Sequence, residues 1–192
     1  MIKTENFEQV VVENQAALRE WLLEHHQQEA SVWLVTYKKS EKEKYVSREE
    51  VLDELLCFGW IDGIRRKRDE KTSMQLIAPR KAQHWAKSYK ERAAKLIEEG
   101  KMHAAGQASI DRGKASGLWH FMDDVDALIL PEDLKSALKA LPPAATFFDS
   151  INPSSKRFVL RWIKLAKTEK TRKSRILKIA QLSAKGEKLP GS

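Results

Sequence analysis

The sequence predicts an α+β fold, with a small antiparallel or mixed sheet that carries helices on one face and is followed by an all-helical C-terminal subdomain. Up to Pro79, short runs rich in β-branched and aromatic residues alternate with helical patterns. Beyond Pro79 the apolar residues keep a helical spacing to the end of the chain. Hydrophobic residues make up 42% and charged residues 32% of the 192 residues, which is typical of a globular protein with a packed core.

The first strands and helix follow from local signals. A β-branched run predicts a short strand at residues 8–12. Asn14 is a suitable N-cap for a helix over residues 15–26, whose apolar side chains recur at helical spacing. Residues 31–38 alternate and are rich in β-branched and aromatic side chains, so we expect a second strand there.

A capping box marks the next helix. In Ser47-Arg-Glu-Glu50, the serine hydroxyl can accept from an early backbone amide, and the last glutamate can reach back to the serine amide. This motif predicts a helix over residues 48–57, which Gly59 ends. Residues 60–64 and 72–78 are then expected to form two further strands.

The remainder is expected to be helical, and it divides the chain into two parts. Ser88 and Ser154 are suitable N-caps. Residues 123–130 are expected to form a loop or short turn between the parts. We therefore expect an α+β domain at residues 1–122 and a basic helical subdomain at residues 123–192. The expected helices of the remainder cover residues 89–99, 103–116, 131–141, 144–150, 156–166 and 170–184.

The beginning of the sequence does not look like a secretory signal, because it carries Glu5 and Glu8 and only a very short apolar run. No apolar stretch approaches the roughly 20 residues that cross a bilayer. We therefore expect a cytoplasmic protein without a membrane span. The single cysteine, Cys57, excludes an internal disulfide and is expected to be a buried, small apolar side chain.

Positive charge is concentrated near the C-terminus. The chain has a net charge of +8, and residues 153–188 hold twelve Lys and Arg against only Glu169 and Glu187. In residues 156–167 the apolar side chains gather on one helical face and the basic ones crowd the other. Such a segment favours an anionic partner such as nucleic acid or membrane headgroups, or is simply a solvated helix face.

Three basic residues of the last predicted helix define a possible nucleic-acid surface. Arg172, Lys173 and Arg175 lie close together in the sequence, and neutralising several phosphates would give nonspecific, salt-sensitive binding. No recognised nucleic-acid module is present, and Trp162 falls on the apolar face rather than among the charges. A solvated helix face is the alternative interpretation.

Five groups of short motifs carry a resemblance that extends over nearly the whole chain. They are Leu56-Cys-Phe-Gly-Trp-Ile-Asp-Gly63, Pro79-Arg-Lys81, Leu96-Ile-Glu-Glu-Gly-Lys-Met102 with Gly106, Pro131-Glu-Asp-Leu134, and Ala166-Lys-Thr-Glu-Lys-Thr-Arg172 with Arg175-Ile176. In these motifs the sequence resembles the bacterial YdeI/OmpD-associated proteins, also labelled bacteriocin-protection proteins. The resemblance implies a protective or stress-related role and no established reaction. The porin association in the family name does not fit a sequence without an export signal.

One stretch departs from the family pattern. Where the family usually has Trp-Ser-x-x-Asn, this chain has Trp85-Ala-Lys-Ser-Tyr89. A polar role of that serine and asparagine is therefore not carried over to this chain.

The strongest candidate for a binding site combines Gly59-Trp-Ile-Asp-Gly63 with Pro79-Arg-Lys81. Both segments fall at strand ends, where loops on a rigid sheet commonly present ligand contacts. Strand alternation places Trp60 and Asp62 on the same face. An aromatic surface beside a carboxylate and a guanidinium suits a small planar or anionic ligand.

A second interpretation of these segments is structural: Trp60 belongs to the core, and Asp62 forms a salt bridge with Arg65 or Arg80. Lys38 joins the cleft only if its strand lies beside the strand of Trp60, and is otherwise solvated. The residues assigned to the candidate ligand site are Lys38, Trp60, Asp62, Arg65, Arg80, Lys81 and Trp85.

No metal, cofactor or nucleophile motif accompanies these residues. The histidines have no companion at metal-binding spacing, no Gly-rich loop precedes a helix, and no Ser, Cys or Thr stands beside a base. We therefore predict no metal and no cofactor, and the sequence leans against an enzyme. It indicates a cytoplasmic ligand-binding or stress-protection protein. The alternatives are the nucleic-acid binder, a protein-interaction adaptor, and an enzyme that uses Asp62 as a general base on a small substrate. No oligomeric state is predicted.

Overall fold

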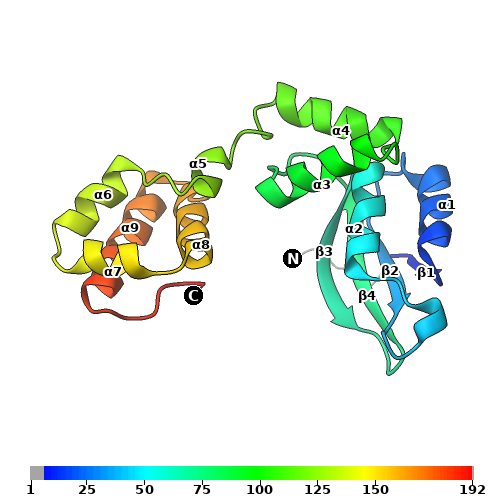
Figure 1. The fold of residues 1–192 in the computed structure, drawn as a ribbon, viewed down its shortest axis with the longest axis horizontal. Helices are drawn as coiled ribbons and strands as arrows, with labels where there is room; N and C mark the ends of the chain where they lie inside the picture. Colours follow the sequence, from blue (N-terminus) through cyan, green and yellow to red (C-terminus); the bar gives the residue numbers. More distant parts are fainter. Residues whose placement is uncertain (1–6, 192) are drawn as a thin grey trace. The chain divides into compact units, whose positions relative to one another are not determined.

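The computed structural model describes residues 7–191, which form two compact units divided between His120 and Phe121 (Figure 1). The N-terminal unit combines a four-stranded sheet with helices, and the described part of the C-terminal unit contains helices and no strands. The predicted α+β fold, with a mixed sheet and a helical C-terminal part, is confirmed. In the part of the chain that the structure describes, no helix combines the length and apolarity needed to cross a membrane.

The sheet has the strand order β1-β2-β4-β3. β1 (Gln9–Val12) pairs in parallel with β2 (Val32–Tyr37). β4 (Thr72–Pro79) pairs antiparallel both with β2 and with β3 (Trp60–Lys67). β3, which carries Asp62, is therefore an edge strand whose neighbour in the sheet is β4.

Two helices pack on the inward residues of the sheet. α1 (Gln15–His25) begins at Asn14, whose side chain accepts a backbone hydrogen bond as predicted. α2 (Arg48–Cys57) begins with the predicted capping box at Ser47 and Glu50. Alternate residues of the strands point toward these helices and share one core with them. Its buried members include Val10, Val12, Leu18, Leu22, Val32, Leu34, Val51, Leu55, Trp60 and Ile77.

β3 contains an irregularity directly after Asp62. Asp62 pairs with Ile77, whereas Arg65 pairs with Gln75, so three steps along β3 match two steps along β4. This is the geometry of a β-bulge, in which an extra residue shifts the alternation of the strand. As a result, Asp62 and Arg65 project from the same face, which an unbroken strand would not allow.

α3 (Lys87–Glu98) begins earlier than the sequence predicts. We expected Ser88 as its N-cap, but the cap is Ala86, and no side chain accepts from the first backbone amides there. The prediction was wrong because Ser88 is a good cap by residue type, whereas the chain already turns into the helix two residues before it. Tyr89 therefore lies in the first turn of α3.

α4 (Ala104–Ala115) packs closely against α2. At Gly106 a Cβ atom would collide with the carbonyl oxygen of Cys57 and with the sulfur of Met102, so the close approach requires glycine. Cys57 is buried, as predicted, and burial raises the pKa of its thiol to about 11. A short 3-10 turn at Lys42–Lys44 completes the described part of this unit.

The C-terminal unit has its own core. Its described helices are α5 (Asp123–Asp126), α6 (Glu132–Lys139), α7 (Ala144–Ser150), α8 (Pro153–Lys164) and α9 (Glu169–Ala184). One apolar face of each longer helix turns inward. The buried side chains include Leu134, Leu138, Phe148, Val159, Ile163, Ile176 and Ile179.

Two local predictions in this unit were wrong. Residues 123–130, expected as a loop or turn, contain the single-turn helix α5, whose first turn is rich in aspartate. The N-cap of α8 is Asn152 and not Ser154. Proline is well suited to the first turn of a helix, so Pro153 lies inside α8 and the cap falls directly before it.

Candidate functional site

Asp62 is held in place by side chains from two other elements of the N-terminal unit. It lies half-buried on β3, and its two carboxylate oxygens accept hydrogen bonds from different elements. The hydroxyl of Tyr89 in α3 donates to Oδ1 at 2.5 Å, and the side-chain amide of Gln75 in β4 donates to Oδ2 at 3.2 Å. Both donors are neutral, so they orient the carboxylate without cancelling its charge.

The Tyr89 hydroxyl keeps its proton at neutral pH and can therefore donate this hydrogen bond. Burial raises the pKa of its phenol to about 12, and the hydrogen bond to Asp62 and the charge of Asp62 act in the same direction. If the phenol of Tyr89 ionised, its negative charge would lie next to the carboxylate of Asp62, and this repulsion disfavours the ionised form. The Tyr89–Asp62 contact thus keeps its geometry across the physiological pH range.

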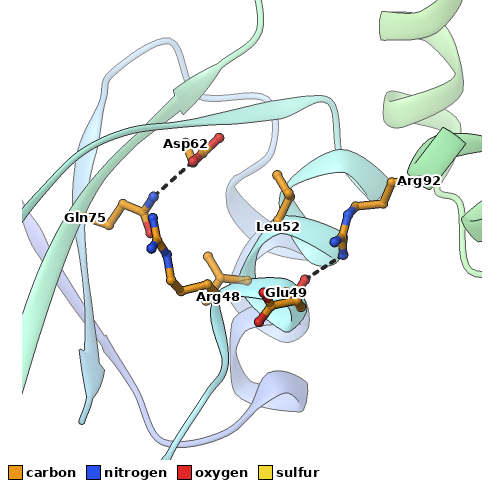
Figure 2. A pocket seen from close by; sticks show the side chains of 7 residues that line it. Arg48, Glu49, Leu52, Asp62, Gln75 and Arg92 are labelled. Carbon is orange, nitrogen blue, oxygen red and sulfur yellow. Dashed lines mark hydrogen bonds between the residues drawn. The ribbon is translucent and has the colours of Figure 1, made fainter. Parts of the chain in front are cut away.

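A pocket of about 160 Å³ opens beside the carboxylate, between the sheet, α2 and α3 (Figure 2). We call it the Asp62 pocket. Arg92 reaches it from α3 and donates to the carboxylate of Asp53 at 2.6 Å. Arg48 reaches it from the first turn of α2 and is exposed, without a hydrogen-bond or ion-pair partner among residues 7–191. The lining residues are Arg48, Glu49, Val51, Leu52, Asp62, Gln75 and Arg92.

Arg65 adds positive charge near this pocket. Its guanidinium donates to the hydroxyl of Ser73 at 2.8 Å and to that of Thr36 at 3.3 Å. Hydroxyl groups leave the charge of Arg65 uncompensated. The pKa of Arg65 is lowered, first by burial and then by the nearby charge of Arg48. The two arginines therefore repel each other, and an anionic group placed close to both would relieve this repulsion.

Arg80 is held differently from Asp62. The side chain is buried, and its guanidinium carbon lies 4.1 Å from the centroid of the Trp85 ring and 5.4 Å from that of Tyr89. Burial lowers its pKa to about 10, an effect that Tyr89 and Asp62 partly offset. No ion pair joins Arg80 to Asp62 within the described residues. Arg80 lines a second cavity, which shares no lining residue with the Asp62 pocket.

Trp60 and Trp85 are both buried core residues. The indole of Trp60 donates to the carbonyl oxygen of His26 at 3.2 Å and packs edge-on against Trp21. It therefore does not line the Asp62 pocket, although it shares a face of β3 with Asp62. Trp85 lies under the guanidinium of Arg80.

The two predicted lysines lie away from the pocket. Lys38 donates to the carbonyl oxygens of Asp69 and Glu70 at 2.7 and 2.9 Å, at the hairpin that joins β3 and β4. The strand register places this hairpin at the opposite end of the sheet from Arg80. Lys81 is exposed, and its backbone amide donates to the side chain of Gln83.

The predicted residues therefore do not line one common hollow. Asp62 borders one pocket and Arg80 borders another, because Tyr89 fills the space between the two side chains. The sequence interpretation missed three residues that build the site, Arg48, Gln75 and Tyr89. For Gln75 the sequence did contain a signal. Gln75 occupies an inward strand position between Ser73 and Ile77, and a buried side-chain amide requires a hydrogen-bond partner.

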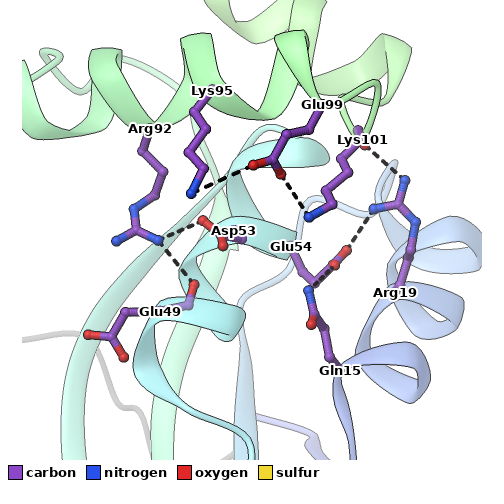
Figure 3. A network of polar contacts seen from close by, with 9 residues as sticks. All are labelled: Gln15, Arg19, Glu49, Asp53, Glu54, Arg92, Lys95, Glu99 and Lys101. Atoms are coloured by element: carbon purple, nitrogen blue, oxygen red, sulfur yellow. Dashed lines mark hydrogen bonds and ion pairs between the residues drawn. The ribbon is translucent and has the colours of Figure 1, made fainter.

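A polar network ties the helices around the Asp62 pocket (Figure 3). Glu54 of α2 is buried and accepts from Gln15 at 2.7 Å and from Arg19 at 2.9 Å, both on α1. Arg92 of α3 pairs with Asp53 of α2. A buried carboxylate is stable only when it is hydrogen-bonded in this way. The network therefore fixes α2 against its neighbours and with it the position of Arg48.

The basic residues of α9 make contacts within the C-terminal unit. Arg172 forms a two-pronged ion pair with Asp133, with nitrogen–oxygen distances of 2.7 and 2.9 Å. Arg175 lies over the ring of Trp162 and donates to its carbonyl oxygen. Lys173 is exposed and lies 3.6 Å from Glu169. All three residues of the predicted nucleic-acid surface thus have intramolecular partners.

Across residues 7–191, no group of three or more His, Cys, Asp or Glu side chains is placed to hold a metal ion. The polar residues that line the Asp62 pocket are two carboxylates, one amide and two guanidinium groups, from Asp62, Glu49, Gln75, Arg48 and Arg92.

Comparison with known families gives two matches on separate segments. Residues 10–109 match a family described as a domain of unknown function (DUF8412). Residues 127–186 match the family described as bacteriocin-protection, YdeI or OmpD-associated, which confirms the resemblance seen in the sequence. Neither the curated proteins nor the solved structures contain a match. The Asp62 pocket lies in the first segment, and the Arg172–Asp133 pair lies in the second.

Proposed function

The chain belongs to the DUF8412 family and carries a C-terminal segment of the YdeI/OmpD-associated type, and we propose that its N-terminal unit binds a small polar molecule in the Asp62 pocket. Neither family description names a reaction. The observation that carries the proposal is the half-buried carboxylate of Asp62, oriented by Tyr89 and Gln75 at the wall of a pocket. Binding sites are commonly hollows with a few polar groups in fixed positions.

The groups that line the pocket define the ligand. The oxygens of Asp62 have lone pairs beyond those used by Tyr89 and Gln75, so they can accept from an ammonium, amide or hydroxyl group. Arg48 offers a guanidinium that has no partner among the described residues, and Arg65 adds positive charge nearby. A ligand that carries a donor at one end and a carboxylate or similar acceptor at the other satisfies both sides.

The size of the pocket restricts the ligand further. A volume of about 160 Å³ lies below the roughly 300–1,000 Å³ of pockets that enclose drug-sized ligands. Small amino acids, hydroxy acids and short amides are of this size. Larger molecules such as nucleotides would have to remain mostly outside.

The geometry supports binding over catalysis. The contacts of Asp62 suit binding better than proton transfer, because each of its carboxylate oxygens already accepts a hydrogen bond from a neighbouring side chain. Tyr89 remains protonated and offers no alternative base. That the protein is an enzyme with Asp62 as its general base stays a prediction. Nucleic-acid binding through α9 also stays a prediction, because no contact of α9 among the described residues specifically supports it. The protective role and the cytoplasmic location belong to the present proposal.

The proposal is tested by ligand-induced thermal stabilisation of the full chain. The probes are glycine, β-alanine, lactate, glycolate and acetamide, each at matched ionic strength. At least one zwitterion or hydroxy acid is expected to raise the melting temperature saturably, because a ligand that binds only the folded state stabilises it. The shift should disappear in Asp62→Asn and in Arg48→Gln.

Two matched variants serve as controls. Asp111→Asn and Arg157→Gln make the same chemical changes at exposed helical positions outside the Asp62 pocket. They should keep the full shift. If no probe gives a saturable shift, or if the shift survives in Asp62→Asn, the Asp62 pocket is not a binding site of this kind.

A further inference from the structure

A second and larger cavity lies in the N-terminal unit, separate from the Asp62 pocket. Its volume is about 470 Å³, and it is bounded by the end of α1, the junction of α2 and β3, the end of β4 and the start of α4. We call it the Arg80 cavity. Its lining residues are His26, Gln27, Phe58, Gly59, Pro79, Arg80, His103, Ala104, Ala105 and Arg112.

The charge of this lining is one-sided. It contains the guanidinium groups of Arg80 and Arg112 and the imidazoles of His26 and His103, and it contains no acidic side chain. Protein surfaces normally mix both signs of charge, and a hollow lined by one sign concentrates counter-ions. This lining therefore favours an anion.

Arg80 gives a second and independent indication. Its side chain is more than nine-tenths buried, with 7% of its surface exposed, and its Nε has no hydrogen-bond partner. Among residues 7–191, no protein group accepts a hydrogen bond from the Arg80 guanidinium. Buried charged groups are normally paired, because an unpaired buried charge is costly. The rings of Trp85 and Tyr89 contact the guanidinium but accept no conventional hydrogen bond from it. An anion in the Arg80 cavity would supply the missing acceptor.

His103 provides a donor of fixed direction. Its Nδ1 accepts from the backbone amide of Ala105 at 3.2 Å and caps α4, so in the neutral ring the hydrogen is on Nε2. The pKa of His103 is lowered by burial and then by the charges of His26 and Arg19, which favours that neutral ring. The first turn of α4 therefore brings an imidazole N–H and the positive end of a twelve-residue helix to the same cavity.

We propose that the Arg80 cavity binds a phosphate group, either free or as part of a small phosphomonoester. Two guanidiniums and an imidazole N–H at a helix N-terminus match the several oxygens of a tetrahedral dianion better than the two oxygens of a carboxylate. The phosphate oxygens accept from Arg80 and Arg112, and the Nε2–H of His103 donates to a further oxygen. This site goes beyond the proposed Asp62 pocket, because the two linings have no residue in common.

Titration calorimetry of the full chain with inorganic phosphate tests the proposal, with sodium chloride at equal ionic strength as the reference. The account predicts saturable phosphate binding with one site per chain. Because Arg80 is buried and its replacement could unfold the unit, the main variant is Arg112→Gln, which changes an exposed residue of α4. Its phosphate affinity should fall at least tenfold.

Arg48→Gln and Arg157→Gln are the controls, since the first removes a guanidinium from the Asp62 pocket and the second removes one from the C-terminal unit. Both should keep the wild-type phosphate affinity. Absence of saturable binding would overturn the proposal. An affinity that falls in Arg48→Gln but not in Arg112→Gln would also overturn it, because phosphate would then occupy the Asp62 pocket.

Discussion

The hydroxyl of Tyr89 lies 2.5 Å from the carboxylate of Asp62 and donates a hydrogen bond to it. The same tyrosine ring contacts the guanidinium of Arg80 on its other side. Two segments that are distant in the sequence thus meet at one residue of α3. This residue separates the Asp62 pocket from the Arg80 cavity, and it explains why Asp62 and Arg80 interact electrostatically without forming an ion pair.

Replacing Tyr89 by phenylalanine removes the donor and leaves Asp62 with Gln75 as its remaining hydrogen-bond partner. We expect the free energy of unfolding to fall by about 1.5–3 kcal/mol, the usual range for a hydrogen bond to a charged group. Chemical denaturation at pH 7 measures this change. Tyr37→Phe is the matched control, since the Tyr37 hydroxyl makes only an exposed contact of 3.5 Å and should cost less than about 0.5 kcal/mol. Equal effects of the two substitutions would contradict the role given to Tyr89.

Serine at position 86 should stabilise α3. Ala86 occupies the N-cap with extended backbone angles, and no side chain accepts from the first amides of the helix. A serine there can accept one of these hydrogen bonds, which typically contributes about 0.5–2 kcal/mol. Urea denaturation of Ala86→Ser should therefore show a higher midpoint. Ala94→Ser, on the exposed side of the same helix, should give no gain. A gain of equal size at both positions would argue against capping.

The Arg172–Asp133 pair gives the C-terminal unit a predictable dependence on pH. The hydrogen bond from Arg172 is the largest cause that lowers the pKa of Asp133 below its ordinary value of 3.8. A carboxylate with a lowered folded-state pKa stabilises the fold above pH 3.8 and loses this effect as the pH falls through the folded-state value. Because both side chains are partly exposed, the contribution is about 1 kcal/mol or less.

Asp133→Asn is the corresponding variant. It should lower the free energy of unfolding at pH 7, and this loss should shrink as the pH falls through the folded-state pKa of Asp133, because the wild-type carboxylate then becomes protonated. Asp149→Asn, an exposed change without an ion pair among the described residues, is the control. A difference between wild type and Asp133→Asn that stays constant from pH 7 to pH 2 would rule out the ion pair as its cause.

Gly106→Ala should destabilise the N-terminal unit. In an exposed helix this substitution normally stabilises by about 0.5–1 kcal/mol. At Gly106 the added methyl group would meet the carbonyl oxygen of Cys57, which belongs to the backbone and cannot rotate away. We expect a loss of about 1–3 kcal/mol, the range for overpacking, in thermal or chemical unfolding. Ala108→Ser on the exposed side of α4 should be nearly neutral. Stabilisation by Gly106→Ala would show that α4 does not approach α2 so closely.

Local signals predicted the elements well where one side chain determines a helix end. Asn14 and the Ser47–Glu50 capping box fix the starts of α1 and α2, and both act as the sequence indicates. The start of α3 was misplaced because residue type alone favours Ser88, while packing sets the cap at Ala86. The start of α3 therefore depends on tertiary contacts, which a local sequence pattern does not contain.

The site was predictable in part. Asp62 was identified because it lies in the segment Gly59-Trp-Ile-Asp-Gly63 at a strand end, where strand alternation places it on the same face as Trp60. Its partner Tyr89 was not identified, because pairing across β3 and α3 depends on how the helix packs. The β-bulge after Asp62 was equally hidden, since nothing in the alternation of β3 indicates an extra residue. The separation of Asp62 from Arg80 follows from the position of Tyr89.

Nuclear magnetic resonance of the ¹⁵N-labelled chain, titrated with the same small zwitterions, hydroxy acids and amides, tests the central claim most directly. The account predicts that at least one compound produces saturable shifts centred on the amides of Arg48, Asp62 and Gln75, and that Asp62→Asn abolishes them. Saturable shifts that leave these three amides unchanged, or the same shifts in Asp62→Asn, would contradict it.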